Sequence, residues 1–314
     1  MTAQALWCID PDTARIEPGA EGQGIAVRTL FSGISRGTER LVASGRVPEA
    51  EAHRMRAPFQ EGDFPFPVKY GYAAVGRAED GDLAGRTVFA LFPHQDRFRL
   101  PADALIPLPE GLAPERAVLA ANMETALNIL WDSGAGAGDR VAVIGGGLVG
   151  LLTAWLAARL PGAEVTVIDI QPERRALAEA LGCAFALPDQ AQPCQDCVIH
   201  TSATDQGLAL AIRIAGTQST ITEASWHGEG RSAIPLGGAF HSQRLRIVGS
   251  QVGSIPPDRA PRWTYRRRLS KALELLRDDR LDALISGETA FADLPAAYGR
   301  ILADPATLCH RIRY

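Results

Sequence analysis

The segment 141–150 constrains the fold most, because an apolar strand runs directly into a glycine-rich turn and then into an apolar helix. Its three spaced glycines follow the pattern G-x-G-x-x-G. In a dinucleotide-binding unit the first glycine allows the tight turn, the second lets the backbone approach a pyrophosphate, and the third lets helix and strand pack closely. The helix N-terminus also favours an anion. The residues predicted to contact the cofactor here are Gly145, Gly147, Leu148, Val149 and Gly150.

Asp169 is predicted to select the cofactor, because it follows the next predicted strand, nineteen positions after Gly150. A carboxylate there accepts hydrogen bonds from an adenosine ribose 2′-hydroxyl and repels a 2′-phosphate. Arg174 and Arg175 could instead meet a 2′-phosphate, although a pair at a helix start is more often exposed to solvent. We therefore predict NAD(H) rather than NADP(H) as the cofactor.

Strands and helices alternate through the second half of the chain, and most of the strands are apolar enough to be covered on both faces. Repeated βα units of this kind imply an α/β fold with a doubly wound parallel sheet. The predicted strands are 141–144, 165–168, 197–200, 219–224 and 245–250, and the predicted helices between them are 148–160, 172–181 and 206–215.

The first part of the chain has a different pattern, with short β-like runs separated by Gly, Pro and Asp clusters. Beyond Gly253 come a proline-rich connection, a helix that carries Arg266, Arg267 and Arg268, and a closing segment expected to return to the first lobe. The three arginines are interpreted as a solvent-exposed face. The predicted domains are a β-rich domain at 1–121 and a dinucleotide-binding domain at 122–252. Residues 253–314 are predicted to return to the β-rich domain.

Composition excludes several partner classes. The net charge is −4 and the pI about 5.9, so the chain has no electrostatic attraction to nucleic acid or to an anionic membrane surface. Residues 141–158 carry no charge, but the glycine cluster within them indicates a strand, turn and helix rather than a membrane span. The five cysteines are an odd number and no signal stretch precedes Ile9, which favours a cytoplasmic location.

The order of a β-rich lobe, a dinucleotide-binding domain and a return to the first lobe resembles the medium-chain dehydrogenase/reductase superfamily. The motif Gly-Ile-Ser-Arg-Gly-Thr-Glu at 33–39 most resembles the sequences of the branch that contains bacteriochlorophyllide a dehydrogenase. The resemblance implies a GroES-like catalytic domain beside the Rossmann domain, oxidoreductase activity and a homodimer. The segments that carry it are 32–39, 70–76, 106–112, 136–143 and 249–250.

The chain departs from the zinc-dependent members of that superfamily at each catalytic ligand position. The resemblance places the first ligand at Ser35 or Arg36, the next at Tyr72 with Ala73 beside it, and the last near Ala121. Zinc in proteins is bound by Cys, His or carboxylate side chains. The resemblance therefore implies no metal site and a zinc-independent reaction.

Without a Lewis acid, side-chain hydrogen-bond donors must act on the substrate oxygen. The candidates are Ser35, Thr38, Tyr72 and His94. The resemblance aligns Thr38 with a hydroxyl used in proton relay, and it places Arg36 near the cofactor pyrophosphate. The backbone at Tyr72 should point inward, as it does where relatives hold zinc.

The predicted function is an NAD(H)-dependent oxidoreductase that transfers hydride between nicotinamide and a small alcohol or carbonyl substrate. An enoyl or quinone reductase of the same superfamily is one alternative, and a non-catalytic dinucleotide-binding protein is another. His227 and His241 are further candidates to line the cofactor cleft.

Overall fold

The computed structural model describes residues 2–314 and divides into two compact units. Unit 1 contains the residues through Ala121 together with Leu269–Tyr314, and unit 2 is Asn122–Arg268. Each unit is described by itself.

Residues 253–268 belong to unit 2, whereas the sequence predicts that the return begins at 253. The reason is side-chain packing inside unit 2. Trp263 packs on Trp131 with ring centroids 4.7 Å apart, and the Tyr265 hydroxyl donates to the Gly253 carbonyl over 2.8 Å.

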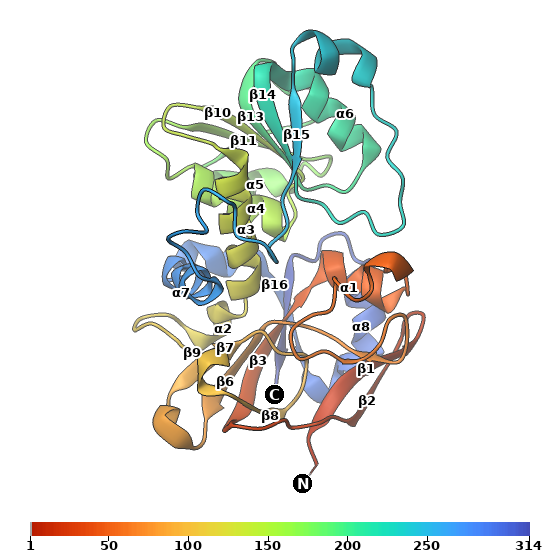
Figure 1. Ribbon diagram of the computed structural model, residues 1–314, viewed down its shortest axis with the longest axis vertical. Helices are drawn as coiled ribbons and strands as arrows, with labels where there is room; N and C mark the ends of the chain where they lie inside the picture. The colour runs from red at the N-terminus through yellow and green to blue at the C-terminus, as the bar shows by residue number, and fades with distance from the viewer. Residues whose placement is uncertain (1) are drawn as a thin grey trace. The chain divides into compact units, whose positions relative to one another are not determined.

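Unit 2 contains a six-stranded parallel sheet with the strand order β12-β11-β10-β13-β14-β15 (Figure 1). The predicted doubly wound sheet is confirmed, and the sequence missed only the short strand β12. The strands are β10 (Arg140–Ile144), β11 (Glu164–Ile168), β12 (Ala184–Ala186), β13 (Gln195–His200), β14 (Ala215–Glu223) and β15 (Arg246–Gly249). The helices are α3 (Ala120–Ser133), α4 (Leu148–Ala157), α5 (Arg174–Ala180), α6 (Asp205–Ile214) and the start of α7 (Tyr265–Leu275).

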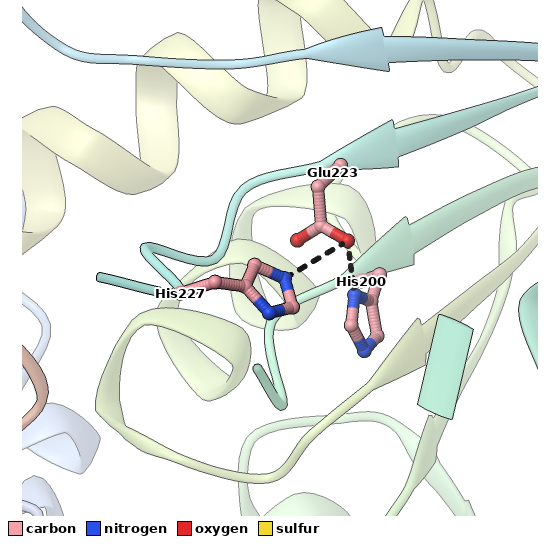
Figure 2. Close-up of side chains that lie close together, drawn as sticks. All are labelled: His200, Glu223 and His227. Carbon is pink, nitrogen blue, oxygen red and sulfur yellow. Dashed lines mark hydrogen bonds and ion pairs between the residues drawn. The ribbon is translucent and has the colours of Figure 1, made fainter. Parts of the chain in front are cut away.

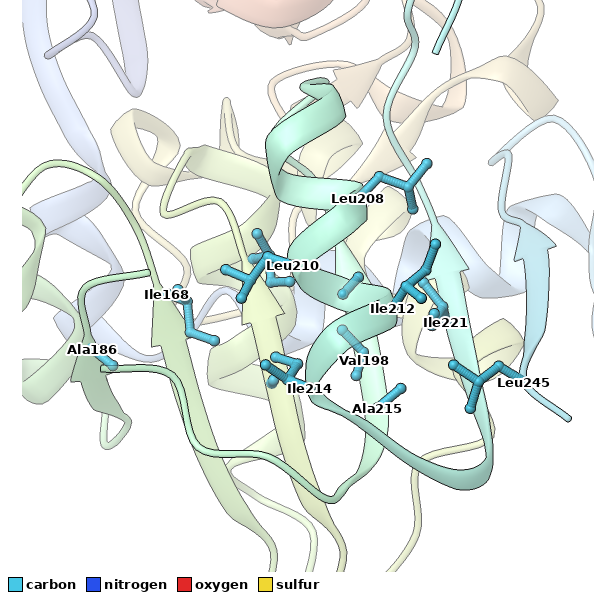
Figure 3. Packing of buried hydrophobic residues seen from close by; sticks show 13 residues of the cluster. Ile168, Ala186, Val198, Leu208, Leu210, Ile212, Ile214, Ala215, Ile221 and Leu245 are labelled. Carbon is cyan, nitrogen blue, oxygen red and sulfur yellow. The ribbon is translucent and has the colours of Figure 1, made fainter. Parts of the chain in front are cut away.

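Helix α6 covers one face of this sheet through a continuous apolar cluster (Figure 3). Leu208 and Ile212 are four residues apart and therefore lie on one side of the helix, where they are buried with Val198 of β13 and Ile221 of β14. Complete burial of each such side chain contributes about 1.5–3 kcal/mol. This packing fixes β13 and β14 side by side, so the residues at their carboxyl ends are held in register.

Unit 1 contains two sheets (Figure 1). The larger has the order β16-β17-β3-β6-β7-β9, with β8 also paired to β3, and the smaller has the order β2-β1-β5-β4. The strands are β1 (Gln4–Asp10), β2 (Thr13–Pro18), β3 (Ile25–Ser35), β4 (Glu61–Gly62), β5 (Val68–Lys69), β6 (Ala74–Ala78), β7 (Thr87–Ala90), β8 (Arg97–Leu100), β9 (Ile106–Pro107), β16 (Ile285–Ala290) and β17 (Cys309–Arg313). The helices are α1 (Arg36–Ala43), α2 (Pro114–Ala117), α8 (Leu294–Ala303) and the end of α7.

The closing segment of the chain completes the larger sheet of unit 1. Strand β17 pairs antiparallel with β3, and the register sets Cys309 opposite Ser35. Among residues 2–314, no helix is both long and apolar enough to cross a membrane.

Candidate functional site

The glycine turn after β10 has the geometry of a pyrophosphate cradle. Gly145 has a φ of +106°, which favours glycine. A Cβ at Gly150 would lie 1.9 Å from the Gly145 carbonyl oxygen, so only glycine allows α4 to pack this closely. A Cβ at Gly147 would meet no atom within 4 Å, so the backbone there is open to a ligand. These three environments fit the three predicted roles.

Asp169 lies beside this turn, immediately after β11. Its Oδ2 accepts a hydrogen bond from the Gly146 N–H over 2.5 Å, and its Oδ1 accepts one from the Gln171 N–H over 2.8 Å. The Arg174 side chain also lines the turn, since its Cγ would be 3.4 Å from a Cβ at Gly146. Arg174 is half-buried, so the interpretation of the pair as solvent-exposed holds only for Arg175.

The turn lies where the strand order reverses between β10 and β13. Thr201 follows β13, and its hydroxyl donates to the carbonyls of Ile144 and Gly145 over 3.1 and 3.0 Å. In doubly wound sheets, ligands bind at the carboxyl ends of the strands at this reversal. The glycine turn of unit 2 therefore lies at the edge of the sheet where doubly wound folds bind their ligands.

Three of the predicted catalytic residues are adjacent in unit 1. The Tyr72 hydroxyl is hydrogen-bonded to the side chains of Ser35, at the end of β3, and Thr38, in α1. Burial raises the pKa of Tyr72 to about 12, against the opposing effect of these two hydrogen bonds. The phenol therefore stays protonated at neutral pH and acts as a hydrogen-bond donor.

His94 lies behind this hydroxyl cluster and is fully buried. Its Nε2 is 3.0 Å from Oε2 of Glu39, which also accepts from the Tyr298 hydroxyl over 2.9 Å. The other Glu39 oxygen, Oε1, accepts from the Ser35 N–H over 2.7 Å. The Nδ1 of His94 is 2.8 Å from the Ser32 hydroxyl. His94 is thus placed to hold Glu39 and, through it, the backbone of Ser35.

Arg36 has a contact that the sequence did not predict. Its Nε donates to the Leu302 carbonyl over 3.0 Å, within unit 1. The contact with a pyrophosphate that the resemblance implies stays a prediction.

The side chains at the positions of the relatives' catalytic zinc ligands do not fit that metal. Ser35 and Tyr72 offer neutral hydroxyls hydrogen-bonded to each other, and Ala121 offers a buried methyl group. Zinc selects thiolate, imidazole and carboxylate ligands. These side chains would therefore not hold zinc here.

A different group of side chains converges at the carboxyl ends of β13 and β14 (Figure 2). His200 Nδ1 is 2.5 Å from Oε2 of Glu223, and His227 Nε2 is 3.7 Å from the same oxygen. Within residues 2–314, this is the one group of three His, Cys, Asp or Glu side chains whose ligand atoms all lie within 4.8 Å of one another. The sequence predicted no metal site, and of these three residues only His227 was a candidate, to line the cofactor cleft. Pairing of the two strand ends was the signal that could have found the others.

Comparison with known proteins agrees with this fold. Residues 133–222 match the family model described as alanine dehydrogenase/PNT, C-terminal domain. D-guloside 3-dehydrogenase of Escherichia coli K12 is 27% identical over 205 residues, which cover 61% of this chain. The chain spans 59% of that relative's length.

Solved structures match over the whole chain. L-idonate 5-dehydrogenase from E. coli K-12 superposes with a TM-score of 0.80 at 14% identity, covering 100% of this chain and 99% of that one. The rspB alcohol dehydrogenase from E. coli CFT073, solved with NADH, gives 0.77 at 15% identity and covers 99% of each chain. These structural similarities show that the chain has the α/β fold of the medium-chain dehydrogenases/reductases.

Proposed function

We propose that the chain is an NAD(H)-dependent oxidoreductase that transfers hydride between nicotinamide and the carbon of a small alcohol or carbonyl compound, such as a polyol. The observation that carries this proposal is the glycine turn of unit 2, with Asp169 beside it at the carboxyl ends of the strands. The activity named for the curated relative, D-guloside 3-dehydrogenase, also supports it.

Unit 2 would hold the cofactor through the turn at 145–150, with Asp169 on the adenosine ribose. When bound, the nicotinamide accepts or supplies the hydride. In unit 1, Tyr72 would donate a hydrogen bond to the substrate oxygen as charge develops on it. Ser35 and Thr38 fix the Tyr72 hydroxyl and offer a path for the proton that leaves or joins that oxygen. His94 would act as a positioning residue through Glu39.

Hydride transfer itself tests this proposal. NADH deuterated at nicotinamide C4 should transfer deuterium to a member of a panel of small ketones, aldehydes and sugar derivatives, detected by mass spectrometry. Transfer to an activated alkene or a quinone instead would identify the alternative reductase. Binding of NADH without transfer to any acceptor would favour a non-catalytic dinucleotide-binding protein.

Asp169→Ser is expected to narrow the difference in affinity between NADH and NADPH. The wild-type carboxylate should repel a 2′-phosphate, and its removal should change the affinity ratio about tenfold or more, roughly 1.4 kcal/mol per factor of ten. Fluorescence titration with both cofactors measures the ratio. Glu173→Ser, which removes a nearby exposed carboxylate, is the matched control and should leave the ratio unchanged. Tighter binding of NADPH by the wild-type protein would refute the role given to Asp169.

Turnover is expected to resist chelation, because the hydroxyls of Ser35, Thr38 and Tyr72 replace zinc in the proposed reaction. Incubation with EDTA, followed by transfer into metal-free buffer, should leave kcat unchanged. A loss of activity that added Zn²⁺ restores would contradict zinc independence. Membership of the zinc-lacking branch, a homodimer and a cytoplasmic location stay predictions.

A further inference from the structure

We propose that His200, Glu223 and His227 form a binding site for a divalent transition-metal ion of the zinc class. The site lies within unit 2, at the carboxyl edge of its sheet. Its ligands are different residues from the hydroxyl groups to which the proposed function assigns the chemistry, so either proposal can fail without the other.

Strand register brings the first two ligands together. His200 is the last residue of β13 and Glu223 the last of β14, and the parallel pairing sets them directly opposite each other. Directly paired residues of neighbouring strands point to the same face of a sheet. His227 then returns from the following loop, four residues after Glu223, to the same carboxylate. Two of the three ligands are therefore positioned by a packed sheet, and the third by the loop that follows it.

One carboxylate oxygen lies between the two imidazoles (Figure 2). Oε2 of Glu223 faces both rings, while its Oε1 accepts a hydrogen bond from the Ser225 N–H over 2.8 Å. Glu223 thus directs one oxygen at both rings while its other oxygen is held by the backbone.

The far nitrogen of His200 has the partner that a metal-bound imidazole normally has. His200 Nε2 is 2.7 Å from the Ser202 hydroxyl, which is 2.9 Å from the Thr204 hydroxyl. Thr204 Oγ1 in turn accepts from the Gly207 N–H at the start of α6. Such outer hydrogen bonds fix the orientation and tautomer of a ligating histidine. A bound ion would displace the proton that His200 Nδ1 shares with Glu223, and the Nδ1 lone pair would then face the ion while Nε2 donates to Ser202.

The distances between the ligand atoms suit a zinc-class ion after a small movement of the Glu223 carboxylate. Metal–ligand distances of about 2.0–2.2 Å place neighbouring ligands of a tetrahedral ion about 3.3 Å apart. The 3.7 Å separation of His227 from Glu223 is near this value. The 2.5 Å contact between His200 and Glu223 would have to open by about 0.8 Å to reach it. A rotation of the carboxylate would provide this, with loss of the direct hydrogen bond to His200 and a shift of Oε1 relative to the Ser225 N–H.

Access to the cluster is from one side. The His200 side chain is fully buried, whereas those of Glu223 and His227 are 17% and 22% exposed. An ion can therefore enter past the two outer ligands, and water can fill its remaining position. Two neutral imidazoles and one carboxylate leave a divalent ion with a net charge of +1 and an open coordination position, which is typical of three-ligand zinc sites.

Cobalt binding to the full chain tests the site. Protein stripped with EDTA should bind one Co²⁺ per chain, with the visible absorption of a four-coordinate ion, and Zn²⁺ should displace it. His227→Gln should weaken binding by more than about a hundredfold, because loss of an outer partner alone typically costs about 10–100-fold. Ser202→Ala, which keeps all three ligands, should cost about 10–100-fold. The exposed His241 supplies the matched control, and His241→Gln should bind Co²⁺ as the wild type does.

Wild-type protein that binds no Co²⁺ or Zn²⁺, or a His227→Gln variant that binds as tightly as wild type, would overturn the site. His227 lies on a loop, and thermal unfolding of the stripped variant checks that it is folded. Turnover sensitive to chelation in both the wild type and His227→Gln would instead point to a metal elsewhere, against the proposed zinc independence and not against this cluster.

Discussion

Tyr72→Phe is expected to lower kcat by about a hundredfold or more, roughly 3 kcal/mol, because one hydrogen-bond donor to the developing charge is lost. NADH affinity should stay nearly unchanged, since the glycine turn and Asp169, to which we assign most of the cofactor contacts, lie in unit 2. Steady-state kinetics with the acceptor found in the deuterium experiment, together with NADH titration, provide both values.

Tyr70→Phe is the matched control. Tyr70 is 5% exposed and its ring packs edge-on against Tyr72, with centroids 5.9 Å apart, so this variant removes a neighbouring hydroxyl from the same packing environment. It should turn over near the parental rate. A Tyr72→Phe variant that also keeps that rate would make Tyr72 a packing residue and shift attention to Thr38.

Gly147→Val is expected to weaken NADH binding by at least about a hundredfold, or about 2.7 kcal/mol, without unfolding the protein. A Cβ at Gly147 meets no atom within 4 Å, and the φ of −74° and ψ of 179° are extended values that valine adopts readily. The added side chain would instead occupy the space through which a pyrophosphate approaches the backbone. Calorimetric NADH titration and thermal unfolding separate the two effects.

Gly136→Val provides the control for this substitution. Gly136 lies before the amino end of β10, whereas the glycine turn follows its carboxyl end. A Cβ at Gly136 has only an ordinary 3.7 Å contact with the Asp139 carboxylate. NADH binding should be unaffected. Equal losses of affinity in both variants would mean that the glycine turn is not the pyrophosphate site.

The parts of this chain that local pattern determines were predictable. The turn at 145–150 and the apolar strands of unit 2 have strong local signals, because glycine spacing and strand burial are visible in consecutive residues. Strand β12 was missed because it has only three residues, too few to show a period.

Buried polar partners were not predictable, because they come from distant parts of the chain. Arg268 was interpreted as part of a solvent-exposed face, yet it is 2% exposed and bonded to Glu124 and Asn128 of α3. A run of arginines gives no sign of which one meets a carboxylate. The pairing of His200 with Glu223 was not predictable for the same reason, since it depends on the register of two strands whose ends are 23 residues apart.

The pairing of β17 with β3 also affects the order in which the parts of the chain can fold during synthesis. Unit 2 is continuous in sequence and is translated in full before β17 appears, so it can fold while the ribosome is still extending the chain. Strand β3, which ends at Ser35, lacks its neighbour until Cys309–Arg313 emerges. Until then the Phe31–Ser35 part of this edge of β3 is unpaired and can pair with a wrong strand. The hydroxyl cluster at the end of that strand is therefore among the last parts of the protein to acquire its final surroundings.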